Sequence, residues 1–366
     1  MINVRNEIKP LKKVLLHRPS NELKVLNENN KEKYLFDELP DIEKAIKEHD
    51  NFANILKKEG VEVLYLEDLM AKVLKENDIK EEFIKEYLEI QNSNDEKVYQ
   101  ELLSIKDEKE LVLETMSGLN GKLDPIPNLY FTRDTFTIIG SGIALYHMHT
   151  NVRNREVIYG KYINKYYFKL PIYYKQEYEG MIEGGDVMLL DDKTLIIGQS
   201  ERTTFDAAYK LATNVLKNDK QYENVLLMEI PSKRACMHLD TVFTRFDDNK
   251  FIIFDEIYQT LKLKIIDKNG VNEINDDLKT TLNKLLKRED VKIITCGNND
   301  NKVIEQWNDA CNTLCISPNK FIVYDINETT NKKFEKEGAT LLKIPSKELL
   351  KGRGGAHCMS MPLLRE

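Results

Sequence analysis

The sequence predicts an α/β fold in which five similar strand-rich units form a ring, with one helical insertion. Predicted β-hairpins recur at a spacing of about 50 residues, each opens with a short polar residue, and a helix and an apolar strand separate successive hairpins. Such self-similarity is typical of repeat architectures, in which each unit needs its neighbours to bury its faces. The alternative is an open α/β sheet, in which the hairpins would lie in a row.

Four of these hairpins can be located directly. They begin at Asp134, Asp186, Asp240 and Asn312, and each returns through an apolar run after a turn of small or polar residues. The segment that begins at Cys358, together with the first strand of the chain, closes the set as a fifth unit. A ring therefore predicts that these five polar residues point toward a common centre.

The rest of the sequence fits one catalytic domain over residues 1–366. A strand at residues 14–16 precedes a helix that begins at Pro40 and ends at Gly60, and a strand follows at residues 61–66. Residues 67–120 are highly charged and have helical spacing without a strand signal. We interpret residues 67–120 as a helical insertion that covers one face of the domain.

Composition excludes several classes of function. The 366 residues include 41% hydrophobic and 31% charged residues, and the formal net charge of −7 argues against a nucleic-acid partner. Five cysteines without CxxC spacing indicate neither a disulfide framework nor a zinc ribbon. No apolar run approaches the roughly 18 residues of a membrane helix, and no signal region is evident, so we expect a cytoplasmic protein with no membrane partner.

Cys358 is the candidate nucleophile, because a glycine-rich loop leads directly into it. Glycine is unfavourable inside helices and strands, so residues 352–355 form a loop that lets the backbone approach another group closely. A thiol at the end of such a loop is supported from behind and open in front, which suits a reactive cysteine.

A histidine near this thiol is needed to move protons at neutral pH. Of the six histidines, His238 stands two residues before Asp240, and residues two apart in a strand face the same side. We therefore expect His238 and Asp240 to project into the centre and His357 to point away from it. Glu183 is placed to orient the imidazole of His238.

These groups together predict a cationic substrate. Carboxylates that face a thiol repel anions and suppress the thiolate, whereas a planar guanidinium offers five N–H donors and leaves its central carbon open to sulfur. Arg153, Arg202 and Arg353 lie near the hairpins or the glycine loop, so they are candidates to bind a carboxylate at the other end of the substrate.

Several segments of the sequence resemble arginine deiminase. The most specific are PNLYFTRD at 127–134, EGGD at 183–186, MHLDT at 237–241, EQWND at 305–309 and RGGAHCMSMP at 353–362. LFDELP at 35–40, EHD at 48–50 and VLYLEDL at 63–69 are also similar. The resemblance therefore runs nearly from end to end.

The resemblance implies a pentein-like fold, a five-bladed pseudo-symmetric α/β propeller. It implies that Asp134 and Asp240 clamp the guanidinium and that Cys358 is the nucleophile. It further implies that His238 acts first as general acid and then as general base, and that Glu183 supports both His238 and the guanidinium.

The resemblance also assigns the amino-acid end of the substrate. Asn128, Arg153, Arg202 and Arg353 would hold it, and Asp186 would be a further acid behind the site. Neither a metal nor an organic cofactor is expected, because the substrate is already an activated cation. We expect a homo-oligomer, either a dimer or a tetramer.

The predicted reaction is hydrolysis of L-arginine to L-citrulline and ammonia through a covalent thiouronium on cysteine. Alternatives are an agmatine deiminase, a dimethylarginine hydrolase or an amidinotransferase, which would keep the centre but change the groups around it. From a different class, the chain could be an arginine-binding protein without catalysis.

Overall fold

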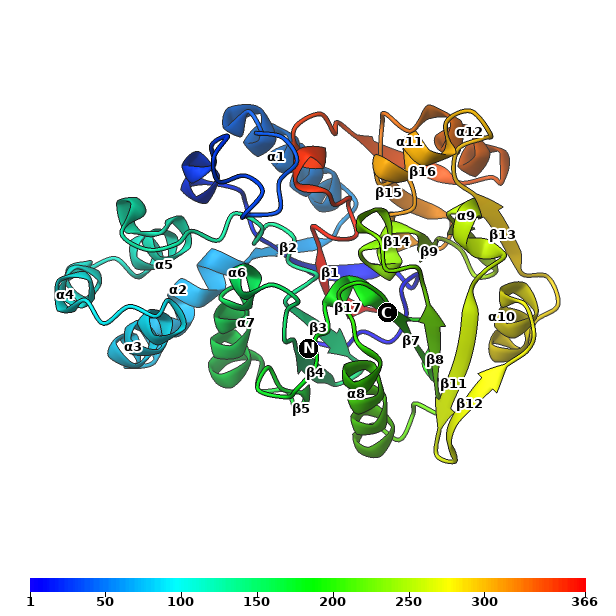
Figure 1. The fold of residues 1–366 in the computed structure, drawn as a ribbon, viewed down its shortest axis with the longest axis horizontal. Coiled ribbons are helices and arrows are strands. Elements are labelled where there is room, and N and C mark those ends of the chain that lie inside the picture. Colours follow the sequence, from blue (N-terminus) through cyan, green and yellow to red (C-terminus); the bar gives the residue numbers. More distant parts are fainter.

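The computed structural model describes residues 1–366 and contains five separate β-sheets, four with three strands and one with five. In Figure 1 the strands lie toward the middle of the molecule, and helices such as α1, α8, α10 and α12 lie around them. The strands are β1 (Leu11–Leu16), β2 (Glu62–Tyr65), β3 (Phe136–Ile139), β4 (Gly142–Leu145), β5 (Ile172–Tyr174), β6 (Val187–Leu189), β7 (Thr194–Gln199), β8 (Asn224–Glu229), β9 (Phe243–Arg245), β10 (Lys250–Ile253), β11 (Lys262–Asp267), β12 (Gly270–Ile274), β13 (Lys292–Thr295), β14 (Leu314–Ser317), β15 (Lys320–Tyr324), β16 (Thr340–Ile344) and β17 (Met361–Arg365).

All five sheets share one arrangement of three strands. Two antiparallel strands come first, and a third strand lies parallel to the second of them. This order holds for β3-β4-β5, β6-β7-β8, β9-β10-β13, β14-β15-β16 and β17-β1-β2. The four predicted hairpins and the predicted pairing of the first and last strands are therefore confirmed, while β11 and β12 extend the second sheet.

Twelve α-helices connect or cover these sheets. They are α1 (Ile42–Lys58), α2 (Leu66–Glu76), α3 (Lys80–Ile90), α4 (Glu96–Ser104), α5 (Glu108–Ser117), α6 (Asn151–Asn154), α7 (Val157–Ile163), α8 (Phe205–Asn218), α9 (Asp255–Tyr258), α10 (Leu278–Leu286), α11 (Lys302–Trp307) and α12 (Glu328–Lys336). The predicted helix between Pro40 and Gly60 is α1, in which Asp41 caps the first turn by accepting a hydrogen bond from Lys44 N. None of the helices combines the length and the apolar character that crossing a lipid bilayer requires.

The segment between β2 and β3 contains the helices α2, α3, α4 and α5 and no strand. It begins one residue earlier than expected, because Leu66 already belongs to α2 and not to the preceding strand. Its helices pack against α7, where the ring of Phe83 lies 5.3 Å from that of Tyr162 and 6.1 Å from that of Tyr159. Buried residues of α2, α3 and α5 and those of the β3–β5 sheet belong to one hydrophobic cluster.

Cys358 does not begin a strand, which corrects the prediction for the last unit. Met359 N donates to Gly355 O and Ser360 N donates to His357 O, so this segment closes a turn on itself. Strand β17 therefore starts only at Met361. Cys358 is consequently held by a turn that follows the glycine loop.

His17 forms a buried ion cluster where the end of β1 meets the helical segment. Its two ring nitrogens lie 2.8 Å from Glu67 Oε2 and 3.1 Å from Glu22 Oε1, and the side chain is fully buried. Burial alone would lower the pKa of His17, but Glu67 and Glu22 outweigh it and raise the pKa to about 10. His17 is therefore charged in the folded protein at neutral pH.

Replacing His17 by glutamine should destabilise the protein in a pH-dependent way. At pH 6 the free energy of unfolding should fall by about 3–5 kcal/mol, because two buried carboxylates lose their cation. The difference from the wild type should shrink as pH rises from about 6.5 toward about 10, since the folded state loses a proton that the unfolded state has already released. Urea unfolding at several pH values measures this difference.

His49→Gln is the matched control, because His49 is equally buried but burial lowers its pKa to about 3. Its effect should be constant between about pH 8 and 10, where His49 carries no proton in either the folded or the unfolded state. A constant effect for His17→Gln as well would contradict the charged state of His17.

Candidate active site

The Cys358 thiol lies buried between an amide and a carboxylate. Its Sγ is 3.0 Å from Nδ2 of Asn312 and 3.3 Å from Oδ2 of Asp240, and only 2% of the residue is exposed. Burial, together with the negative charges of Asp240 and Asp134, raises the pKa of this thiol well above its usual value. In the free protein the sulfur is therefore protonated at neutral pH.

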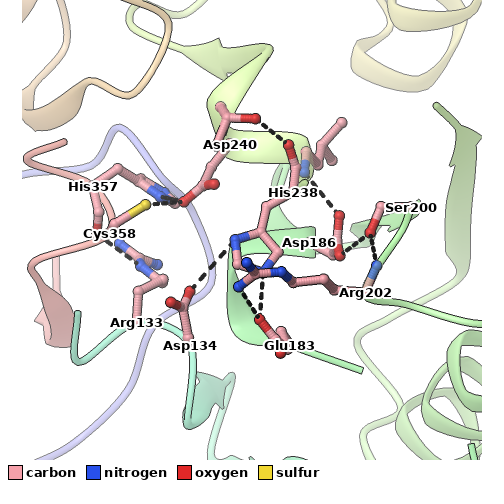
Figure 2. A network of polar contacts seen from close by, with 12 residues as sticks. Arg133, Asp134, Glu183, Asp186, Ser200, Arg202, His238, Asp240, His357 and Cys358 are labelled. Carbon is pink, nitrogen blue, oxygen red and sulfur yellow. Dashed lines mark hydrogen bonds and ion pairs between the residues drawn. The ribbon is translucent and has the colours of Figure 1, made fainter. Parts of the chain in front are cut away.

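His238 lines the same pocket as this thiol and is engaged by two carboxylates (Figure 2). Its Nε2 lies 2.6 Å from Oε2 of Glu183, and its Nδ1 lies 3.8 Å from Oδ1 of Asp134. Burial alone would lower the pKa of His238, but Asp134 and Glu183 outweigh it and raise the pKa to about 9. His238 is therefore protonated at neutral pH and can donate a proton.

Glu183 remains an anion although it is fully buried. Burial opposes its ionisation, but Arg202, whose NH1 donates to Oε2 across 3.2 Å, and the hydrogen bond to His238 hold the pKa of Glu183 well below its usual range. Glu183 also accepts a hydrogen bond from His149 N. Its carboxylate thus has a fixed position from which it orients the imidazole of His238.

Asp134 and Asp240 each keep one buried oxygen without a hydrogen-bond partner, Oδ1 in both cases. Their Oδ2 atoms are engaged: that of Asp134 accepts from Arg153 across 2.7 Å, and that of Asp240 lies 2.8 Å from Nδ1 of His357. Buried oxygens in proteins nearly always have a donor. The two free oxygens are therefore sites at which the N–H groups of a ligand would bind.

Short 3-10 turns place His238 and Asp240, which corrects the prediction that they share a strand. Residues Leu239–Thr241 form the turn η6, closed by hydrogen bonds from Thr241 N to His238 O and from Val242 N to Leu239 O. The two side chains therefore reach the centre from different directions. Figure 2 shows His238 directed toward Glu183 and Asp240 directed toward Cys358.

Asp186 supports this turn from behind and does not line the pocket. Its Oδ1 accepts from Leu239 N across 2.8 Å, and its Oδ2 accepts from the hydroxyls of Ser200 and Thr203, each across 2.6 Å. Burial raises the pKa of Asp186 to about 7. Every oxygen of Asp186 is thus engaged by the protein, and its contact with η6 positions His238.

The three predicted arginines line the pocket and differ in how many of their guanidinium nitrogens have a hydrogen-bond partner. Arg153 is fully engaged, because its guanidinium donates to Glu156, to Asp134 and to the carbonyl of Asn128. Arg202 donates to Glu183 and keeps its Nε without a partner.

Arg353 has no hydrogen-bond acceptor for any of its three guanidinium nitrogens, and its guanidinium carbon lies 3.4 Å from the centre of the Trp307 ring. The free donors at this end of the pocket therefore belong to Arg353 and Arg202.

The pocket brings together most of the predicted site residues. It is lined by Leu35, Asn128, Phe131, Asp134, Arg153, Arg202, Met237, His238, Gly352, Arg353 and Cys358. Asn128 donates its amide to Tyr34 O across 2.8 Å, which fixes the segment that carries Leu35 over the pocket. Glu183 and Asp240 lie just outside this lining and contact His238 and Cys358, which belong to it. Asp186 lies further back, where it bonds to Ser200, Thr203 and Leu239.

His357 points into the site, so the prediction that it points away is wrong. Strand alternation does not apply, because the residue lies in the turn before β17. Its Nδ1 contacts Asp240, and its Nε2 lies 3.4 Å from Oε2 of Glu7. Although burial opposes ionisation, the hydrogen bond to His357 holds the pKa of Asp240 below its usual value.

The structure also adds residues to which sequence reasoning gave no role. Glu156 pairs with Arg153 from three positions away, a spacing that is visible in the sequence. Trp307 lies in EQWND at 305–309, one of the segments that resemble arginine deiminase. The sequence indicates Asn312 only as the start of a hairpin. No sequence signal linked Glu7 to His357.

Asp134, Glu183 and His238 are the groups with suitable spacing for a metal ion, since one ligand atom from each lies within 4.8 Å of the others. However, Arg153 and Arg202 already donate to the two carboxylates, and His238 is itself protonated near neutral pH. This charge distribution favours a planar cation that donates hydrogen bonds over a metal ion that needs free electron pairs.

Gly185 allows the imidazole of His238 to take its position. A Cβ added at Gly185 would lie 2.6 Å from Nδ1 of His238, closer than any ordinary contact. Gly185→Ala should therefore displace the ring from Asp134 and Glu183 and lower the pKa of His238 by at least about one unit from about 9. NMR titration of the histidine side chains measures this pKa.

Gly270→Ala, in the distant β11–β12 turn, is the control. Its φ of +113° makes alanine strained there, but no atom lies within 4 Å of the added carbon. It should lower stability and leave the pKa of His238 unchanged. If the pKa of His238 is unchanged in Gly185→Ala, the contacts of His238 with Asp134 and Glu183 do not determine that pKa.

Comparison with known proteins identifies the family. The family model for arginine deiminase matches residues 32–117 and 96–365. The arginine deiminase of Streptococcus sanguinis (strain SK36) is 43% identical over 402 residues, covering 100% of this chain and 98% of the relative. That of Streptococcus gordonii (strain Challis) is 42% identical over 411 residues with the same coverage.

Solved structures of low sequence identity share the mixed α/β fold. They include DDAH from Pseudomonas aeruginosa complexed with citrulline (TM-score 0.60, 15% identical, 96% of this chain and 99% of that chain). SxtG, an amidinotransferase from Microseira wollei, matches with a TM-score of 0.59 at 16% identity. The match covers 100% of this chain and 97% of the SxtG chain. The family model and the two streptococcal relatives show that the chain belongs to the arginine deiminase family.

Proposed function

We propose that this protein hydrolyses L-arginine to L-citrulline and ammonia, with Cys358 as the nucleophile. One observation carries the proposal: the buried thiol contacts Asp240 and lies within the electrostatic influence of Asp134, and each of these aspartates has a buried oxygen without a hydrogen-bond partner. A guanidinium supplies N–H donors for both oxygens and presents its carbon to the sulfur. Membership of the arginine deiminase family supports the same substrate.

The five sheets support a five-bladed α/β propeller around this site. Each sheet begins with the same order of antiparallel and parallel strands, and the residues at the predicted unit starts contact one another or adjoining turns. We extend the proposal to a single catalytic domain over residues 1–366 that carries residues 67–120 as its helical insertion. A homo-oligomer, dimer or tetramer, in the cytoplasm remains a prediction from the sequence.

Arginine would activate the nucleophile by its own charge. In the free protein the carboxylates raise the pKa of the thiol. A guanidinium that donates hydrogen bonds to Asp134 and Asp240 would place positive charge beside the sulfur. It would lower the pKa of the thiol again, because an opposite charge within about 4–6 Å favours ionisation. The thiolate would therefore form mainly in the complex.

The proton count of the proposed reaction closes without a cofactor. When arginine binds, the thiol of Cys358 releases its proton to solvent. The sulfur then bonds to the guanidinium carbon, a C–N bond breaks, and the nitrogen leaves as ammonia with a proton donated by His238. A thiouronium with one positive charge remains on Cys358. His238 then takes a proton from water, the water oxygen bonds to the carbon, and the C–S bond breaks to release citrulline and restore the thiol.

The amino-acid end of arginine would bind at Asn128, Arg202 and Arg353. Arg353 has three unpartnered nitrogens and Arg202 has one, so these two supply free donors for a carboxylate. Arg153 donates to Asp134 and Glu156, so its proposed part is to hold Asp134 and the wall of the pocket. An α-carboxylate is thus the feature that would separate arginine from agmatine.

The direct test is citrulline release from L-arginine, agmatine and dimethylarginine. We expect turnover of L-arginine and at least a 100-fold lower kcat/KM for agmatine, because two buried arginines would lack their partner. Cys358→Ala should abolish turnover, whereas Cys296→Ala, which removes an equally buried thiol, should keep it. Faster turnover of agmatine would refute the carboxylate site, and arginine binding without turnover in the wild type would identify a binding protein.

A further inference from the structure

Both polar atoms of the Asn312 amide form hydrogen bonds around Cys358. Its Oδ1 accepts from Cys358 N across 3.0 Å and from Gly355 N across 3.1 Å. Its Nδ2 donates to Cys358 Sγ across 3.0 Å and to Asp240 O across 3.1 Å. One amide therefore holds the backbone of the nucleophile, the glycine loop, the reacting sulfur and the turn of Asp240.

The bonding partners fix which way this amide faces. Two backbone N–H groups require an acceptor, so the carbonyl oxygen of Asn312 must face Cys358 N and Gly355 N. The NH₂ group must then face the sulfur and the carbonyl oxygen of Asp240. The orientation that gives the sulfur a donor is thus the one that satisfies all four contacts.

The equivalent position in three other units is an aspartate. Asp134, Asp186 and Asp240 each stand just before the first strand of their sheet, as Asn312 does before β14. A carboxylate at position 312 would retain the acceptor for the backbone N–H groups. It would, however, offer no donor to the sulfur and would add a negative charge about 3.0 Å from it, where Asp240 and Asp134 already disfavour ionisation of the thiol.

We infer that Asn312 is a further catalytic residue of the proposed reaction, whose Nδ2–H group donates to the sulfur of Cys358 and stabilises its thiolate. A neutral thiol is a weak acceptor, whereas a thiolate is a strong one. The bond therefore strengthens when the sulfur ionises, and it offsets part of the repulsion from Asp240. This inference rests on the proposed role of Cys358 as nucleophile.

The test is the pH dependence of Cys358 alkylation by iodoacetamide, followed by mass spectrometry of the peptide that contains Cys358. The reagent is neutral and reports the thiolate in the free enzyme without arginine. In Asn312→Asp the midpoint of the alkylation profile should move up by at least one pH unit, so that alkylation below the midpoint slows at least tenfold. In Asn312→Ala the midpoint should move in the same direction by less, because the donor is lost without added charge.

Asn331→Asp is the matched control. Asn331 is equally buried and donates to Tyr324 O across 2.9 Å, but it belongs to α12 and has no contact with the thiol. Its alkylation profile should match the wild type whatever its effect on stability. If Asn312→Asp does not fold, Asn312→Ala carries the comparison alone.

The outcomes separate this inference from the proposed function. An upward shift in the Asn312 variants supports the inference even if the wild type releases no citrulline, in which case the proposed function is the part that fails. Unchanged midpoints in folded Asn312→Asp and Asn312→Ala, with citrulline still formed by the wild type, overturn the inference alone. Asn312 would then only hold the glycine loop in place through its contacts with Gly355 N and Cys358 N.

Discussion

The repulsion that buried carboxylates exert on a buried thiolate is the constraint on which the whole site depends. Asp240 lies 3.3 Å from the sulfur of Cys358, and Asp134 adds a second negative charge that raises the pKa of the thiol. The free protein can hold this arrangement because the sulfur keeps its proton. A substrate that carries a planar positive charge removes the constraint where it binds, so the charge pattern both selects the substrate and limits the thiolate to the complex.

The repeated strand order explains how one chain gathers these groups. Asp134, Asp240, Asn312 and Cys358 come from different sheets, and each stands before the first strand of its sheet. Short turns then direct the side chains inward, and buried contacts such as Asp186 with Leu239 N hold those turns. Backbone geometry at the ends of strands therefore positions these four groups, while Arg153 of α6 and Trp307 of α11 contact Asp134 and Arg353 from the helices.

Much of this could be predicted from the sequence, because hairpins and helices leave local patterns. Asp134, His238, Asp240 and Cys358 were found from their place before apolar runs, and the structure brings them together. The direction of His357 was predicted wrongly, because a turn and a strand can share the same side-chain pattern and differ only in backbone hydrogen bonds. The pairing of Arg153 with Glu156 was also missed, although their three-residue spacing is visible in the sequence, because that spacing leads to an ion pair only where the chain is helical.

The most direct test of the account is rapid acid quenching of the protein during turnover of L-arginine, followed by mass spectrometry of its peptides. We expect an adduct on Cys358 whose added mass is that of arginine less ammonia, absent before arginine is added. This adduct should disappear as citrulline accumulates. Citrulline formed at full rate with no such adduct at any time, or with the adduct on another residue, would contradict nucleophilic attack by Cys358.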